Sequence, residues 1–278
     1  MFVTKFENIK YQSAFVRIIF FIVCLAVIWF PYAIAINFIV RDDPNLATII
    51  TMVFLFCDFI FLQTLFNKHI YQETAVFQKY GLLFNNFALN QLIKGLAIGF
   101  TFCWSLFITE ALFGWIYITS SSDFIFKIVL EGFLSALGIA LAEELVFRGW
   151  ILYELEEDYS KSSALWISSI LFAVAHFLKP IDEIVRTFIT FPALLLLGLT
   201  LVLAKRGHQN YLTISIGIHA GLVWSYYILN VGNLIIYTNR VPHWVTGIDD
   251  NPIAGILGLI FLGILALTMQ EKAKNVNT

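Results

Sequence analysis

The sequence predicts an all-α integral membrane protein, a bundle of about eight transmembrane helices, on three observations. Hydrophobic residues make up 59% of the 278 residues and charged residues 13%, against about 45–50% and 25% in ordinary soluble domains. The mean hydropathy is +0.82. The apolar residues are gathered into runs close to the ~20 helical residues that cross a bilayer. A water-soluble enzyme could not bury so much apolar surface in one core.

The composition also excludes several other classes of protein. A net charge of −2 offers no basic face for nucleic acid, so the expected partners are the lipid bilayer and a membrane-bound peptide or protein substrate. The 28 Phe, 11 Tyr and 7 Trp exclude a disordered chain. Cys24, Cys57 and Cys103 lie inside apolar runs, and we therefore expect no disulfide framework.

Eight apolar runs, joined by short polar connections, predict a single membrane domain over residues 1–278. The predicted spans are 17–40, 46–66, 92–119, 127–147, 164–178, 184–204, 211–230 and 253–269. The fifth and eighth are the shortest, and such helices are tolerated in a bilayer when neighbouring helices pack around them.

The first run has a second interpretation as a signal peptide. Basic residues precede it, and Ala33-Ile34-Ala35 resembles a cleavage site. The run continues to Val40, which is too long for the apolar region of a signal peptide, so a membrane span is favoured.

The distribution of Lys and Arg predicts the orientation. With eight spans and the amino terminus inside, the inner segments hold twelve of these residues and the outer segments five. Positive charges gather on the cytoplasmic side of membrane proteins. We therefore expect a multi-pass protein with both termini in the cytoplasm.

Three charges at the inner end of the fourth span require an explanation, because ionisable groups at membrane depth need a partner or a function. Glu144 and Arg148 are separated by four residues and so share one helix face within reach of an ion pair. Glu143 points about 100° away from that pair. We interpret Glu144 and Arg148 as a structural pair and Glu143 as the carboxylate left for chemistry.

Two histidines lie in neighbouring spans, His176 in the fifth and His219 in the seventh. A single membrane histidine is more often a buried hydrogen-bonding residue. One Glu and two His, however, are the set that binds and deprotonates a water, with or without a metal. Ser215, Ala220 and Gly221 beside His219 are small enough for close helix approach.

These residues resemble the motifs of the CPBP (Abi) family of CAAX-prenyl endopeptidases and bacteriocin-processing enzymes. The motifs are Glu-Glu-x-x-x-Arg at Glu143–Arg148, Phe-x-x-x-His at Phe172–His176, and His219 in a Gly-x-His-Ala context. The resemblance covers a catalytic core of about 128–230 by motif, and the rest by span count.

The resemblance implies an intramembrane peptide hydrolase. Glu143 would be the general base that activates water, supported by Glu144 and Arg148, and Phe172 would pack beside His176. His176 and His219 would position the water or stabilise the transition state. They could also hold a zinc ion, because the family has been discussed both as metalloproteases and as metal-independent glutamate proteases. No cofactor is firmly expected, and the interpretation without a required metal is slightly favoured.

The sequence departs from the family at one position. The family's third motif usually has Asn or Asp four residues after the histidine, where it helps to hold the oxyanion. Here that residue is Val223, which cannot donate a hydrogen bond. The indole N–H of Trp224 is the nearest substitute, and Asn230 is too distant. Losing one oxyanion donor typically costs about 10²–10³ in rate.

Two other functions are left open. A proteolytically weak or inactive member would act by binding, for example as an immunity protein. A small transporter would use the membrane-embedded Asp58 and Glu110 for proton coupling. The acidic residues of the run 154–158 are expected to be solvated in a cytoplasmic connection.

Overall fold

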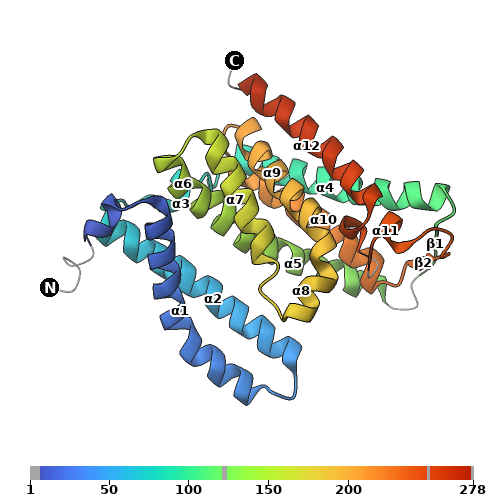
Figure 1. Cartoon of the computed structure of the whole chain (residues 1–278), viewed down its shortest axis with the longest axis horizontal. Coiled ribbons are helices and arrows are strands. Elements are labelled where there is room, and N and C mark those ends of the chain that lie inside the picture. The colour runs from blue at the N-terminus through green and yellow to red at the C-terminus, as the bar shows by residue number, and fades with distance from the viewer. Residues whose placement is uncertain (1–6, 121–123, 249–250, 277–278) are drawn as a thin grey trace. The chain divides into compact units, whose positions relative to one another are not determined.

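The computed structural model describes residues 7–120, 124–248 and 251–276, and over these residues it is an all-α membrane protein with one small two-stranded sheet (Figure 1). Its main helices are α1 (Ala14–Ile39), α2 (Pro44–Phe66), α4 (Asn86–Leu112), α5 (Ile125–Glu144), α7 (Lys161–Ala175), α9 (Phe191–Gly207), α10 (Leu212–Val231) and α12 (Ile256–Val276). The short helices are α3 (Val76–Lys79), α6 (Leu152–Asp158), α8 (Ile181–Thr187) and α11 (His243–Thr246). Two π-helical segments, Asn67–Tyr71 and Leu145–Ile151, extend α2 and α5.

Seven helical stretches within the described residues are long and apolar enough to cross a membrane. They are Ala14–Ile39, Pro44–Tyr71, Asn86–Leu112, Ile125–Asp158, Ile181–Gly207, Leu212–Val231 and Ile256–Val276. The fifth predicted run forms α7, whose 15 residues fall short of a full span at 1.5 Å per residue. The predicted count of about eight therefore corresponds to seven long helices and one short one.

The third predicted run, 92–119, ends earlier than expected. Helix α4 stops at Leu112, and Gly114 takes a left-handed backbone conformation with φ +70°. Strand β1 (Ile116–Ile118) follows and pairs antiparallel with β2 (Ile235–Tyr237). Glycine allows the change of direction, and the β-branched isoleucines favour a strand over a helix. A run of apolar residues could not reveal this boundary.

By contacts, the chain divides into two compact units. The first holds residues 1–79 and 153–159, and the second holds 80–152 and 160–278. The expected single membrane domain remains a prediction.

In the first unit, α1 and α2 form a hairpin, and the start of α1 is fixed by a buried ion pair. Arg17 Nε lies 2.6 Å from Glu154 Oε2 in α6, and both side chains are less than a tenth exposed. Tyr71 Oη lies 3.2 Å from the other carboxylate oxygen. The expectation that the acidic run 154–158 is solvated is therefore wrong for Glu154, because Arg17 provides a partner distant in sequence.

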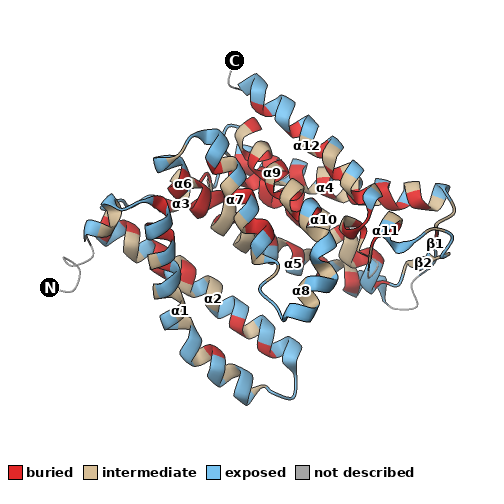
Figure 2. Cartoon of the chain, viewed as in Figure 1, coloured by how far each residue is buried: buried red, intermediate tan, exposed pale blue. Residues whose placement is uncertain are grey.

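In the second unit, α10 is the most enclosed helix. In an 18-residue window of α10, 72% of the residues are buried, compared with 44% for the span that contains α9 and 28% for α4. Figure 2 shows the burial along α9 and α10 in red. Helix α10 packs against α4, α5 and α9, and Ser215 donates to the carbonyl of Leu201 in α9 (2.8 Å). This placement puts His219 in the interior of the unit.

Four glycines let α4 and α10 pack with their backbones in contact. A Cβ added at Gly95 or Gly99 would lie 2.5 or 2.1 Å from a carbonyl oxygen of α10. A Cβ added at Gly217 or Gly221 would lie 2.4 Å from a carbonyl oxygen of α4. In each helix the two glycines are four residues apart, the small-residue spacing typical of close helix pairs in membranes.

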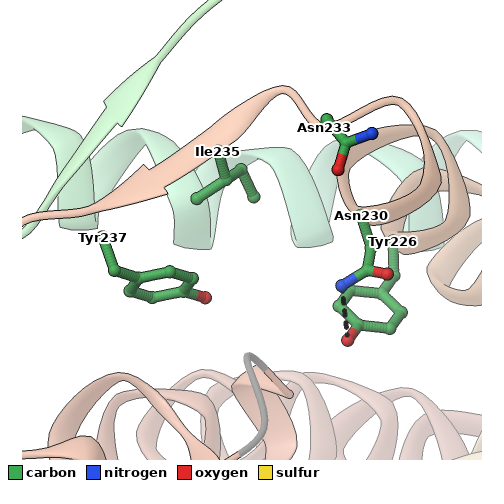
Figure 3. A pocket seen from close by; sticks show the side chains of 5 residues that line it. All are labelled: Tyr226, Asn230, Asn233, Ile235 and Tyr237. Carbon is green, nitrogen blue, oxygen red and sulfur yellow. Dashed lines mark hydrogen bonds between the residues drawn. The ribbon is translucent and has the colours of Figure 1, made fainter.

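A cavity of about 250 Å³ lies near the carboxyl end of α10, and Figure 3 shows the side chains that line it. It is lined by Tyr226, Asn230, Asn233, Ile235 and Tyr237. Asn230 Nδ2 donates to Tyr226 Oη over 3.3 Å. Asn230 lies about 16 Å along the helix from His219 at 1.5 Å per residue, so this cavity is separate from the predicted catalytic residues.

Candidate active site

The end of α5 carries two adjacent glutamates in different surroundings. Glu144 is fully buried, whereas the side chain of Glu143 is 31% exposed. They differ because successive helical residues point about 100° apart. Glu143 is therefore accessible from outside the core, as a group that acts on a substrate must be.

Glu144 is paired with Arg148, as the spacing of four residues predicts. Arg148 Nη1 donates to Glu144 Oε1 over 3.0 Å, and both side chains are 0% exposed. Arg148 belongs to the π-helical segment that begins directly after Glu144. Widened turns of this kind are frequent at functional sites, and this one is not visible in the apolar pattern of the sequence.

His219 contacts both glutamates. Its Nδ1 lies 2.9 Å from Glu144 Oε1, and its Nε2 lies 3.9 Å from Glu143 Oε2. A carboxylate only accepts hydrogen bonds, so the hydrogen of a neutral His219 is on Nδ1 and the lone pair of Nε2 is turned toward Glu143. The buried Glu144 thus orients the histidine that faces the accessible Glu143.

Phe172 contacts both histidines. Its fully buried ring lies 4.7 Å from the ring of His176 and 6.3 Å from that of His219, edge to face in both cases. The guanidinium carbon of Arg148 lies 4.0 Å from the centre of the same ring. His176 is exposed at the end of α7, and its Nδ1 lies 2.9 Å from the carbonyl oxygen of Phe172. Phe172 therefore connects His176 to the cluster around Arg148 and His219.

Three buried polar atoms of this cluster have no hydrogen-bond partner among the described residues: Glu143 Oε2, Glu144 Oε2 and Arg148 Nε. More than nine in ten buried polar groups in proteins are paired. These three atoms leave hydrogen-bonding capacity that a water or a polar substrate could use.

The interpretation of Trp224 as an oxyanion donor is corrected by the structure. Its indole N–H donates to the carbonyl of Val129 over 2.9 Å. Val129 lies about 21 Å from Glu143 along α5 at 1.5 Å per residue. The indole N–H is therefore engaged with a carbonyl distant from Glu143, and it is not the substitute for the polar residue that Val223 replaces.

The zinc interpretation requires that the side chains able to bind the metal lie close enough together to share one ion. Nδ1 of each histidine already has a hydrogen-bond partner. The atoms left to bind zinc are Nε2 of His176, Nε2 of His219 and the Glu143 carboxylate, all of which are common zinc ligands. Across the residues that the structure describes, no three His, Cys, Asp or Glu side chains lie together so that they could hold a metal ion. The residues as they lie do not form a zinc site, and no reaction step is assigned to one.

Helix α9 contributes contacts to the site that the sequence did not predict. The carbonyl of Gly198 lies 3.4 Å from Arg148 Nη2, and the ammonium of Lys205 donates to the Arg148 carbonyl over 2.7 Å. In the sequence, Lys205 is one of the twelve basic residues of the predicted inner segments. Its position in the last turn of an apolar helix was the one available signal.

The model of the Rce1-like type II CAAX prenyl endopeptidase family matches residues 125–238. The match covers less than half of the chain and includes all the candidate site residues from Glu143 to Trp224. No curated protein and no solved structure matches the chain. The resemblance drawn from the motifs is thereby confirmed, and over residues 125–238 this membrane protein is similar to the Rce1-like type II CAAX prenyl endopeptidases, consistent with a CPBP (Abi) intramembrane protease.

Proposed function

We propose that this chain is an intramembrane endopeptidase that hydrolyses a peptide bond of a membrane-associated substrate with a water activated by Glu143. The observation that carries the proposal is the partly exposed Glu143, whose Oε2 lies 3.9 Å from Nε2 of His219, with the His219 ring oriented by the buried Glu144. The family match makes a prenylated, CAAX-like carboxyl-terminal peptide the first substrate class to test.

In the proposed reaction, Glu143 removes a proton from a water while the oxygen of that water bonds to the carbonyl carbon of the scissile peptide bond. Nε2 of His219 accepts a hydrogen bond from the other O–H of that water and so holds the water in place. The carbon–nitrogen bond then breaks, and the proton passes from Glu143 to the leaving nitrogen. The products are a carboxylic acid and an amine, and Glu143 is regenerated.

His176 is proposed to hold the water or the substrate, because Phe172 connects it to the same cluster. The site is proposed to open toward the cytoplasm, with both termini on that side. This orientation rests on the excess of Lys and Arg in the inner segments.

One observation favours a second function. Val223 stands where the family has a hydrogen-bond donor, and the structure gives Trp224 a different partner. A chain without an oxyanion donor could retain the fold and act by binding a membrane protein or peptide. The two functions differ in whether the purified protein cleaves peptides.

The test is a cleavage assay on a library of membrane-associated peptides, some of them prenylated, with purified protein in detergent or lipid. We expect Glu143→Gln to reduce kcat by about 10²–10⁴-fold, the usual contribution of a general base. Glu131→Gln is the matched control, because Glu131 is on the same helix, half exposed and 3.7 Å from Lys127. It should retain wild-type activity.

Equal cleavage by wild type and Glu143→Gln would exclude Glu143 as the base. A wild-type protein that binds peptides of the library but cleaves none would favour the binding function. The same assay with a chelator decides whether zinc is required. We expect activity to persist, and its loss on chelation with recovery on added zinc would contradict the metal-independent mechanism.

A further inference from the structure

Lys205 is a buried cation next to the candidate active site. It lies in the last turn of α9 and is 6% exposed. Burying an ammonium group is costly unless polar partners replace its water. One of its partners is the carbonyl oxygen of Arg148, 2.7 Å from Nζ. A lysine that is buried in the protein and bonded to a residue of the candidate site indicates a role beyond setting the orientation of the chain in the membrane.

The Arg148 carbonyl lies where the backbone changes from π-helix back to α-helix. At this junction the N–H of Leu152 is bonded to the carbonyls of Phe147 and Gly149. Arg148 lies between Phe147 and Gly149 in the sequence, and its carbonyl accepts a hydrogen bond from the Lys205 ammonium. Lys205 is therefore placed to hold the widened turn that follows the two glutamates.

Two further hydrogen bonds, from Arg148 to Glu144 and between Glu144 and His219, connect the contact with Lys205 to the reacting groups. The Arg148 guanidinium contacts the Gly198 carbonyl at 3.4 Å and donates to Glu144 at 3.0 Å. Glu144 in turn lies 2.9 Å from His219 Nδ1, which sets the direction of Nε2 toward Glu143. Helix α9 thus holds Arg148 at both its backbone and its side chain.

We propose that Lys205 is a positioning residue for the hydrolysis: through the Arg148 carbonyl it holds the π-helical turn that aligns Glu144 and His219. This inference rests on the proposed function. Lys205 is buried and bonds the backbone of Arg148, whose side chain pairs with Glu144, so we expect its effect to be on the rate of the chemical step and not on substrate binding.

The test compares Lys205→Met, which removes the ammonium and keeps the length of the side chain, with Lys205→Arg, which keeps a cationic donor. Groups that orient the ligands of a metal site are typically worth about 10–100-fold in activity, and we take the same range for a group that orients a general base and its histidine. We expect Lys205→Met to lower kcat by that factor with KM unchanged, and Lys205→Arg to recover a large part of the loss. Arg206→Gln is the matched control, because the neighbouring Arg206 donates to a carbonyl of α7, that of Lys161, 2.7 Å away.

Hydrogen exchange measured on the segment 145–152 supplies a readout that does not need activity. Lys205→Met should speed exchange there, whereas Arg206→Gln should not. If Lys205→Met fails to fold, Lys205→Gln replaces it, because the shorter and neutral Gln side chain removes the ammonium from the Arg148 carbonyl but remains polar, and a lowered kcat with unchanged KM is again expected.

The outcomes separate the two proposals. A wild-type enzyme that works, with a kcat unchanged in Lys205→Met or a change confined to KM, overturns the positioning role and leaves the proposed function standing. A wild-type protein that cleaves nothing overturns the proposed function itself, together with the role that rests on it.

Discussion

His208 lies in the connection between α9 and α10, outside the membrane-spanning segments, and its imidazole accepts a hydrogen bond from a lysine. Its Nε2 is 3.1 Å from Lys272 Nζ, and its Nδ1 is 2.8 Å from the Ala204 carbonyl oxygen. Burial lowers the pKa of His208. The bond to Ala204 opposes this shift, and the positive charges of Lys272 and Lys94 reinforce it.

The lowered pKa predicts a loss of stability in mild acid. Below the unfolded pKa of about 6.5, the unfolded chain binds a proton at His208 that the folded protein does not bind. The free energy of unfolding contributed by this residue is therefore fully present above about pH 6.5 and falls as the pH drops toward the folded pKa. His208→Gln keeps an acceptor for Lys272 without the titration, so its unfolding midpoint in detergent should fall less than that of wild type between pH 7.5 and 5. Identical pH profiles would contradict this account.

The candidate site was predictable where its residues are close in sequence. The Glu144–Arg148 pair follows from helical spacing alone, and the structure places it in the core. The partner of Trp224 could not be predicted, because Val129 is 95 residues away. Lys205 was missed for the same reason, since its contact with Arg148 joins segments 57 residues apart.

At the scale of helices, the glycine contact between α4 and α10 carries a prediction about stability. A Cβ at Gly99 would lie 2.1 Å from the carbonyl oxygen of Ile218. Neither backbone can yield without separating the helices, so we expect Gly99→Ala to destabilise the protein by about 1–3 kcal/mol, as overpacking usually does. Because Ile218 precedes His219, activity should fall as well. Chemical unfolding in detergent measures the first effect.

Gly138 supplies the control for that experiment. It lies in α5, and a Cβ added there would meet nothing within 4 Å. Replacing glycine with alanine inside a helix raises the free energy of unfolding by up to about 1 kcal/mol. Gly138→Ala should therefore leave stability unchanged or raise it. Similar unfolding midpoints for the two alanine variants would show that α4 and α10 do not pack as closely as described.

The helices themselves were predictable to different degrees. Seven apolar runs became long helices because the bilayer length is a strong constraint on a chain. The strand at Ile116–Ile118 and the burial of Glu154 were not predicted. The first depends on pairing with Ile235–Tyr237, and the second on the partner Arg17. Both are contacts between distant parts of the sequence.

At the scale of the whole molecule, the sequence predicts how many helices there are better than how they pack. Lipid tails are as apolar as a protein core, so hydropathy does not distinguish a lipid-facing side from a buried one. The enclosed position of α10 is instead marked by its small and polar residues, among them Ser215, Gly217, Gly221 and Ser225, all buried.

The orientation is the prediction that belongs to this scale. In the second unit, the end of α12 packs against the end of α9, since a Cβ on Gly207 would lie 3.0 Å from Ala273 N. We expect tags at the two termini to be cleaved by protease from the same, cytoplasmic side of sealed vesicles, because the inner segments hold twelve of the 17 Lys and Arg. This result requires an even number of crossings, so the short helix α7 must cross in addition to the seven long stretches. Tags accessible from opposite sides would mean an odd number of crossings, as when the seven long stretches alone cross, and would contradict the predicted orientation.

The enclosure of α10 has a consequence for how the protein is made. Its mean hydropathy of 1.4 is the lowest of the seven candidate spans, and it carries His219 and several serines toward the interior. Lipid alone is a poor solvent for such a segment. The ribosome delivers α4, α5 and α9 first, and these helices provide the polar and close-packed surroundings that α10 needs. We therefore expect the insertion of α10, which bears His219, to be coupled to the assembly of α4, α5 and α9 in the bilayer.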